Sequence, residues 1–194
     1  MRINPEPETK KIVEVLEMVQ KDWIEHFNKK KVKMISLPDV YKAKDEKILE
    51  SLRKDFKESI LVTSTRNVYN KDNLSTTIIH DADSKVVKQK EYEDILVPDY
   101  SGNFKDDKTT EKYLQALFDT KDSITKILDV LRKISGKETI RSWTPSQKSR
   151  ANNPIRSLCL CYYDLGVFCV FGDGWCGGDS GLSHGVLSDP AKRE

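Results

Sequence analysis

Residues 158–171 read LCLCYYDLGVFCVF, and this stretch decides the fold. Two apolar segments flank Asp164-Leu165-Gly166, a composition typical of a three-residue hairpin turn with glycine at its left-handed position. Pairing across this turn sets Cys161 opposite Cys169 and leaves both faces of the hairpin apolar. Strands that are apolar on both faces are typical of the covered middle of a sheet. We therefore expect a buried C-terminal β-hairpin.

The residues before this hairpin predict an α+β body. Apolar residues recur at helical spacing, which predicts helices over residues 6–30, 44–57, 113–118 and 123–135, the last capped by Ser123 and ended by Gly136. Short strands are expected at residues 32–37, 60–69, 76–80 and 85–90, with Pro38-Asp39 closing the first and turns at 70–73 and 81–84 joining the others. We expect a mostly antiparallel sheet covered by about four helices.

Composition favours a single soluble domain spanning residues 1–194. The chain is 37% hydrophobic and 33% charged, and it contains no apolar run of membrane-spanning length. Charge and proline in the first seven residues are unlike a secretory signal, so we expect a cytoplasmic protein without a membrane partner. Within the domain, residues 1–143 form a helical and meander body, and residues 151–194 form a cysteine- and glycine-rich hairpin subregion, with linker-like residues 144–154 between them. The four cysteines are too sparse for a disulfide scaffold, so we expect reduced thiols.

The net charge does not indicate a nucleic-acid partner. Formal charge at pH 7 is only +2, whereas dedicated nucleic-acid binders usually concentrate basic residues on one face. Nucleic acid remains an open partner, but a protein partner or an anionic small molecule fits the composition better. Self-association into an oligomer also stays open.

Polar residues on either side of the hairpin predict a ligand-binding mouth. Arg141, Arg150 and Arg156 lead into the hairpin, and a second group leads out of it: Trp175, Gly177, Gly178, Ser180 and Ser183. Guanidinium groups, glycine amides and hydroxyls suit a phosphate or a carboxylate, and a tryptophan offers an apolar contact. We expect non-catalytic binding through these loops, and no particular cofactor is indicated.

A catalytic alternative uses the same C-terminal segment. Residues 176–181 resemble the nucleophile segment of chymotrypsin-like serine proteases, which implies that Ser180 would be the nucleophile. The likeness covers six residues, and position 182 is leucine where that family has glycine. A small hydrolase could instead use His184 as general base with Ser180 or Cys176 as nucleophile.

Metal chemistry is the remaining alternative. His80, Asp81 and Asp83 fall on a predicted turn and could surround a divalent ion in a nuclease, although the same residues are good turn formers. The cysteines lack the knuckle spacing of structural zinc sites. We therefore predict no metal site and keep this cluster as the weak candidate.

Overall fold

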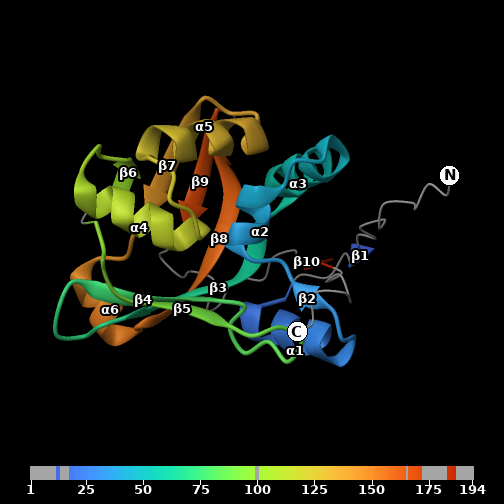
Figure 1. Cartoon of the computed structure of the whole chain (residues 1–194), viewed down its shortest axis with the longest axis horizontal. Coiled ribbons are helices and arrows are strands. Elements are labelled where there is room, and N and C mark those ends of the chain that lie inside the picture. Colours follow the sequence, from blue (N-terminus) through green and yellow to red (C-terminus); the bar gives the residue numbers. More distant parts are fainter. Residues whose placement is uncertain (1–11, 14–17, 99–100, 165, 172–182, 187–194) are drawn as a thin grey trace, which may run out of the picture.

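The predicted hairpin lies in the middle of a seven-stranded sheet. The computed structural model describes residues 12–13, 18–98, 101–164, 166–171 and 183–186. The strand order is β5-β4-β3-β8-β9-β7-β6, so the hairpin strands β8 (Ile155–Asp164) and β9 (Val167–Phe171) are central. Cys161 lies opposite Cys169, as predicted. β8 pairs with β3 (Leu61–Tyr69), and β9 pairs with β7 (Thr139–Trp143) (Figure 1).

The sheet is mostly antiparallel, and the α+β fold class is confirmed. The remaining strands are β4 (Ser75–His80), β5 (Lys90–Leu96) and β6 (Ser101–Asn103), and among the seven strands β7 and β9 form a parallel pair. The prediction of a strand at residues 85–90 is wrong, because β5 begins at Lys90. The residues before it are held by Asn28, whose side chain donates to the Asp83 carbonyl and accepts from the Lys85 amide.

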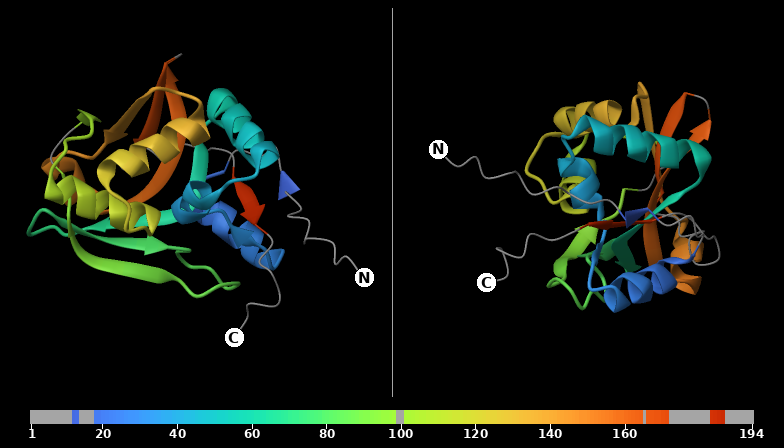
Figure 2. Two further views of the ribbon diagram at one scale, coloured as in Figure 1. Left: turned by 45° about the horizontal axis from the view of Figure 1, so that its top comes forward. Right: turned by 90° about the vertical axis from the view of Figure 1, so that its right-hand side faces the viewer.

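Four helices cover one face of this sheet (Figure 2). They are α2 (Leu37–Lys42), α3 (Glu46–Glu58), α4 (Lys108–Phe118) and α5 (Ile124–Ser135). Their apolar stripes pack on inward-facing side chains of the hairpin, including Leu158, Leu160 and Phe168, to form the larger core. The Ser123 cap and the Gly136 stop are both confirmed, with Gly136 in the left-handed conformation at φ 67°.

The opposite face is covered in part by α1 (Gln20–Lys29), with a small sheet beside it. Trp23 and Phe27 of α1 pack with Val62 and Cys159 in a second core. The small sheet has the order β1-β10-β2, formed by β1 (Ile12–Val13), β10 (His184–Val186) and β2 (Lys33–Met34). The helix predicted over residues 6–30 is therefore wrong at residues 12–13, which pair with β10, and α1 begins at Gln20.

Two further predictions differ from the structure. Pro38-Asp39 lies within α2 and does not simply close a strand, because proline fits the first helical turn and the Asp39 carboxylate accepts from the Ser36 amide at 2.8 Å. The predicted linker at residues 144–154 contains α6 (Gln147–Asn152), whose first turn is capped by the Ser146 side chain. Strand β7 has no counterpart among the sequence predictions.

Candidate anion-binding site

Among the described residues of the predicted mouth, Arg150 has the most unusual side chain. It lies in α6, immediately before the central hairpin, and only 3% of its surface is exposed. Its Nε donates to the Pro145 carbonyl at 2.7 Å, and its guanidinium lies over the Tyr69 ring at 5.2 Å. Its Nη1 is buried without a hydrogen-bond partner. Within the described part of the chain, no carboxylate forms an ion pair with it.

Local sequence explains why Arg150 points inward. Ser146 caps the short helix by accepting from the Ser149 amide, and the Arg150 amide donates to the Ser146 carbonyl. This single turn fixes Arg150 above the end of β3, where Tyr69 supplies a flat aromatic face. A guanidinium stacked on an aromatic ring gains a cation–π attraction. That attraction holds the side chain without neutralising its charge.

Arg156 lies next to the same short helix. It belongs to β8, is 8% exposed, and donates from one Nη to the backbone oxygen and the hydroxyl of Ser149 at 3.1 and 2.9 Å. Its partner across the strand pair is Asn67 of β3. The structure therefore brings Arg150 and Arg156, two of the three predicted arginines, to one end of the sheet.

Neutral polar groups complete this end of the sheet. Asn67 donates from its amide nitrogen to the hydroxyls of Tyr69 and Tyr113, each at 3.0 Å. Burial raises the pKa of both tyrosines above the ordinary value, so both phenols are neutral at physiological pH. The Asn67 Oδ1 and the Thr110 Oγ1 are also buried without hydrogen-bond partners. We call Asn67, Tyr69, Thr110, Tyr113, Arg150 and Arg156 the arginine cluster.

Sequence reasoning missed the residues that β3 and α4 contribute to this cluster. Asn67 carried a usable signal, because asparagine is disfavoured in strands and here stands in a run of β-formers. A buried amide in such a strand needs polar neighbours. Tyr113 and Thr110 carried no comparable signal, since both fit the amphipathic pattern of α4.

The third predicted arginine lies elsewhere. Arg141 is in β7, beside Cys169 of β9 and Asn103 of β6. Its chain neighbour Ile140 packs into the helix-covered core, so alternation directs Arg141 to the other face of the sheet. Arg156 has the same alternation as Leu158 and faces the helices. Arg141 is therefore separate from the arginine cluster.

Ser183 and His184 lie towards the other end of β3. The Ser183 hydroxyl donates to the Val62 carbonyl at 2.9 Å, and the His184 Nε2 contacts the Asp55 carboxylate of α3 at 2.5 Å. Val62 and Asn67 of β3 pair with Cys159 and Arg156 of β8, which lie three residues, or roughly 10 Å, apart along that strand. The remaining predicted residues of this segment lie outside the described residues: Trp175, Cys176, Gly177, Gly178 and Ser180.

The candidate metal residues have other partners. The His80 Nδ1 is 3.0 Å from the Thr65 hydroxyl, and its Nε2 is 2.9 Å from the Ala116 carbonyl. Asp83 pairs with Arg66 at 2.8 Å. In the described part of the chain, no three side chains of ligand type form a metal-binding group.

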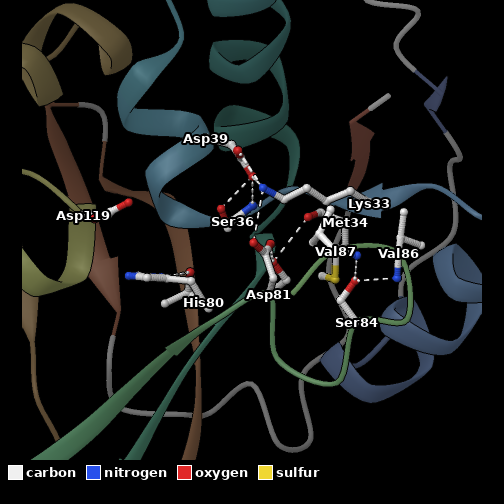
Figure 3. A network of polar contacts seen from close by, with 12 residues as sticks. Lys33, Met34, Ser36, Asp39, His80, Asp81, Ser84, Val86, Val87 and Asp119 are labelled. Carbon is white, nitrogen blue, oxygen red and sulfur yellow. Dashed lines mark hydrogen bonds and ion pairs between the residues drawn. The ribbon is translucent and has the colours of Figure 1, made fainter. Parts of the chain in front are cut away.

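Asp81, the third of these residues, belongs to a separate ionic network. Its carboxylate accepts from Ser64 and pairs with Lys33, whose ammonium also contacts Asp39 at 2.8 Å (Figure 3). Burial raises the pKa of Asp81, and Lys33 opposes that shift in part. The Lys33 ammonium is thus shared by the carboxylates of Asp39 and Asp81. Its pairing with Asp81 links the turn after β4 to β2.

Comparison with known proteins does not assign a family. The chain matches no protein-family model, and no curated protein or solved structure matches it. No helix among the described residues is long and apolar enough to cross a bilayer. The described cysteines, Cys159, Cys161 and Cys169, form no disulfide with one another. The geometry of the arginine cluster is therefore the feature of this protein that bears most directly on its function.

Proposed function

We propose that this protein binds an anionic ligand, bearing a phosphate or a carboxylate, at the arginine cluster without catalysing a reaction. The observation that carries the proposal is the buried Arg150 guanidinium, which has a free Nη1 and no carboxylate partner among the described residues. Buried charges in proteins are normally paired, because an uncompensated one costs several kcal/mol. A bound anion would remove that cost.

The chemistry of the cluster suits an anion. Arginine offers several N–H donors in a planar fork, and phosphate and carboxylate oxygens accept such pairs. Arg156 adds a second positive charge next to Ser149. The neighbouring tyrosines are neutral, so they do not compete with the ligand for the guanidinium charge. We place this binding activity in the cytoplasm, consistent with the lack of disulfides among the described cysteines.

Isothermal titration calorimetry with inorganic phosphate and with acetate tests the proposal. Wild-type protein is expected to bind at least one of these anions, and Arg150→Met is expected to weaken that binding at least tenfold. Arg132→Met is the matched control, because Arg132 lies on the surface of α5 and pairs with Asp129. Equal affinity in wild-type and Arg150→Met, or equal weakening in the control, would contradict the proposal.

One observation favours a hydrolase as the second candidate. The His184–Asp55 contact has the form of a general base and its orienting carboxylate, and the His184 Nδ1 is buried without a hydrogen-bond partner. The nucleophile would be Ser180 or Cys176. Turnover of an activated ester by wild-type protein, lost in His184→Ala, would support this candidate, and no turnover would remove it. The metal-dependent nuclease is not proposed, because both ring nitrogens of His80 are already engaged.

A further inference from the structure

A groove on the same side of the molecule as the arginine cluster has an apolar wall. Its volume is about 340 Å³, and the residues that line it are Leu74, Leu96, Val97, Pro98, Lys105, Asp107 and Thr109. Leu74 and Leu96 are 47% and 58% exposed, which makes them two of the four large hydrophobic side chains exposed in the described chain. Exposed apolar side chains gathered in a concave site mark a binding surface more often than isolated ones do.

The wall is built by two neighbouring strand ends. Ser75 of β4 pairs with Leu96 of β5, and the Val97 amide donates to the Leu74 carbonyl at 2.8 Å. The backbone groups at this end are thus bonded to each other, while the two leucine side chains remain uncovered. A ligand lying here would meet hydrocarbon from Leu74, Leu96 and Val97.

The groove and the arginine cluster share their supports. The Thr144 hydroxyl donates to the carbonyl of the groove residue Pro98 at 3.3 Å, and the next residue, Pro145, accepts from Arg150. Thr109 lines the groove, and Thr110 after it belongs to the cluster. Figure 1 and Figure 2 agree in placing α6, the start of α4 and these ends of β4 and β5 on one side of the molecule.

The charged residues around the groove indicate where the anionic and the apolar part of a ligand would lie. At the start of α4 the Asp107 carboxylate already accepts from the Thr110 amide at 2.7 Å, so an anion would be repelled there. Lys105 supplies a cation that lines the groove, and Arg150 supplies a buried cation on the same side of the molecule. An anionic group is therefore favoured on the side of these cations and an apolar group along the leucine wall.

We infer that the ligand is a small amphipathic anion, an alkyl phosphate or an aliphatic carboxylate, whose acidic group pairs with Arg150 and whose hydrocarbon lies against Leu74 and Leu96. This inference rests on the proposed anion-binding function. Burying one methylene contributes about 0.8 kcal/mol, or roughly a fourfold change in affinity when burial is complete. An open groove gives less, so about a twofold gain for each methylene is expected.

Calorimetric titration with inorganic, methyl, n-butyl and n-hexyl phosphate tests the inference. In wild-type protein the affinity rises with chain length, with n-butyl phosphate bound roughly tenfold more tightly than inorganic phosphate. The double variant Leu74→Ser/Leu96→Ser loses this chain-length dependence and still binds inorganic phosphate as wild-type does. Ile155→Ser is the control, because Ile155 is equally exposed, at 55%, and does not line the groove.

Other outcomes separate the two proposals. Equal affinity for all four phosphates, or a chain-length dependence that survives in the leucine variant, overturns the amphipathic ligand and leaves anion binding at Arg150 intact. Phosphate binding that persists in Arg150→Met overturns the proposed function itself. Co-sedimentation with phosphatidic acid vesicles, without binding of n-hexyl phosphate, would replace a soluble ligand by a lipid surface.

Discussion

Gly185 lies where two parts of the chain approach too closely for a side chain. A Cβ at this position would be 2.6 Å from the Val32 Cγ1 and 3.0 Å from the Phe27 ring. Gly185 is the middle residue of β10, and it pairs with Ile12 on one side and Met34 on the other. Neither neighbour can move freely, because Phe27 and Val32 belong to the second core.

Gly185→Ala is therefore expected to lower the free energy of unfolding by about 1–3 kcal/mol, as overpacking of a tight core does. Urea denaturation followed by tryptophan fluorescence measures this loss. Lys54→Ala serves as the control, since the Lys54 side chain is 70% exposed on the surface of α3. Similar stability of the two alanine variants would show that Gly185 is not sterically required.

Some residues of the candidate anion-binding site could be predicted from the sequence, and others could not. Arg150 and Arg156 were selected because they lead into the hairpin, Arg150 from the polar residues 144–154 and Arg156 from just before the apolar run at 158–163. The third arginine, Arg141, could not be separated from them by sequence, since the strand that turns it to the other face was not predicted. Asn67 was overlooked, although an amide inside a buried strand already indicates a polar cluster.

At the scale of elements, Asp119 fastens strand β5 to the C-terminal end of α4. Its carboxylate accepts from Lys90 at 2.6 Å and from the Tyr92 hydroxyl at 2.5 Å, and it pairs with Lys42 of α2 at 3.3 Å. Burial alone would raise the pKa of Asp119, but the hydrogen bonds from these three residues outweigh it and lower the pKa to about 2. Ionised Asp119 therefore stabilises the native fold.

The sign of the pH dependence follows from this lowered pKa. The native pKa lies below the unfolded value of 3.8, so the stabilisation is complete above about pH 4 and is lost as the pH falls towards 2. Asp119→Asn removes a contribution of about 1–2 kcal/mol at pH 7, reduced from the full shift because the carboxylate is 24% exposed. Asparagine tolerates the left-handed backbone at φ 48°.

Urea denaturation at several pH values between 2.5 and 7 (on the order of one-unit steps) checks this prediction. The stability difference between wild-type and Asp119→Asn should shrink steadily below about pH 4. Asp129→Asn, on the exposed surface of α5, is the control and should cost less than about 0.5 kcal/mol. A difference that is constant with pH would mean that Asp119 acts through packing and not through its charge.

Elements were predicted best where the pattern was local. The helices α3, α4 and α5 and the β8–β9 hairpin have regular apolar spacing and strong end signals, and each is present near its expected position. The helix predicted over residues 6–30 was too long, because residues 12–13 form strand β1. This strand is defined by its partner β10, which lies some 170 residues later in the chain. Periodicity within a short window contains no information about such a partner.

At the scale of the whole molecule, the fold separates the predicted mouth into two places. Arg150 and Arg156 lie near the Tyr69 end of β3, whereas Ser183 and His184 bond near its Val62 end. In the sequence the two arginines precede the hairpin, and Ser183 and His184 follow it. The sequence pattern does not show which end of β3 each of these two groups will reach. The register between β3 and β8 decides this, and it depends on packing across the whole sheet.

The proposed anion binding by this protein depends on the buried charge of Arg150, and the effect of phosphate on stability tests it most directly. The free energy of unfolding would be measured by urea denaturation for wild-type and Arg150→Met, with and without inorganic phosphate at about 100 times the wild-type Kd. We expect phosphate to stabilise wild-type by about 2.7 kcal/mol and Arg150→Met by less than about 0.5 kcal/mol. Equal stabilisation of the two proteins would contradict anion binding at Arg150.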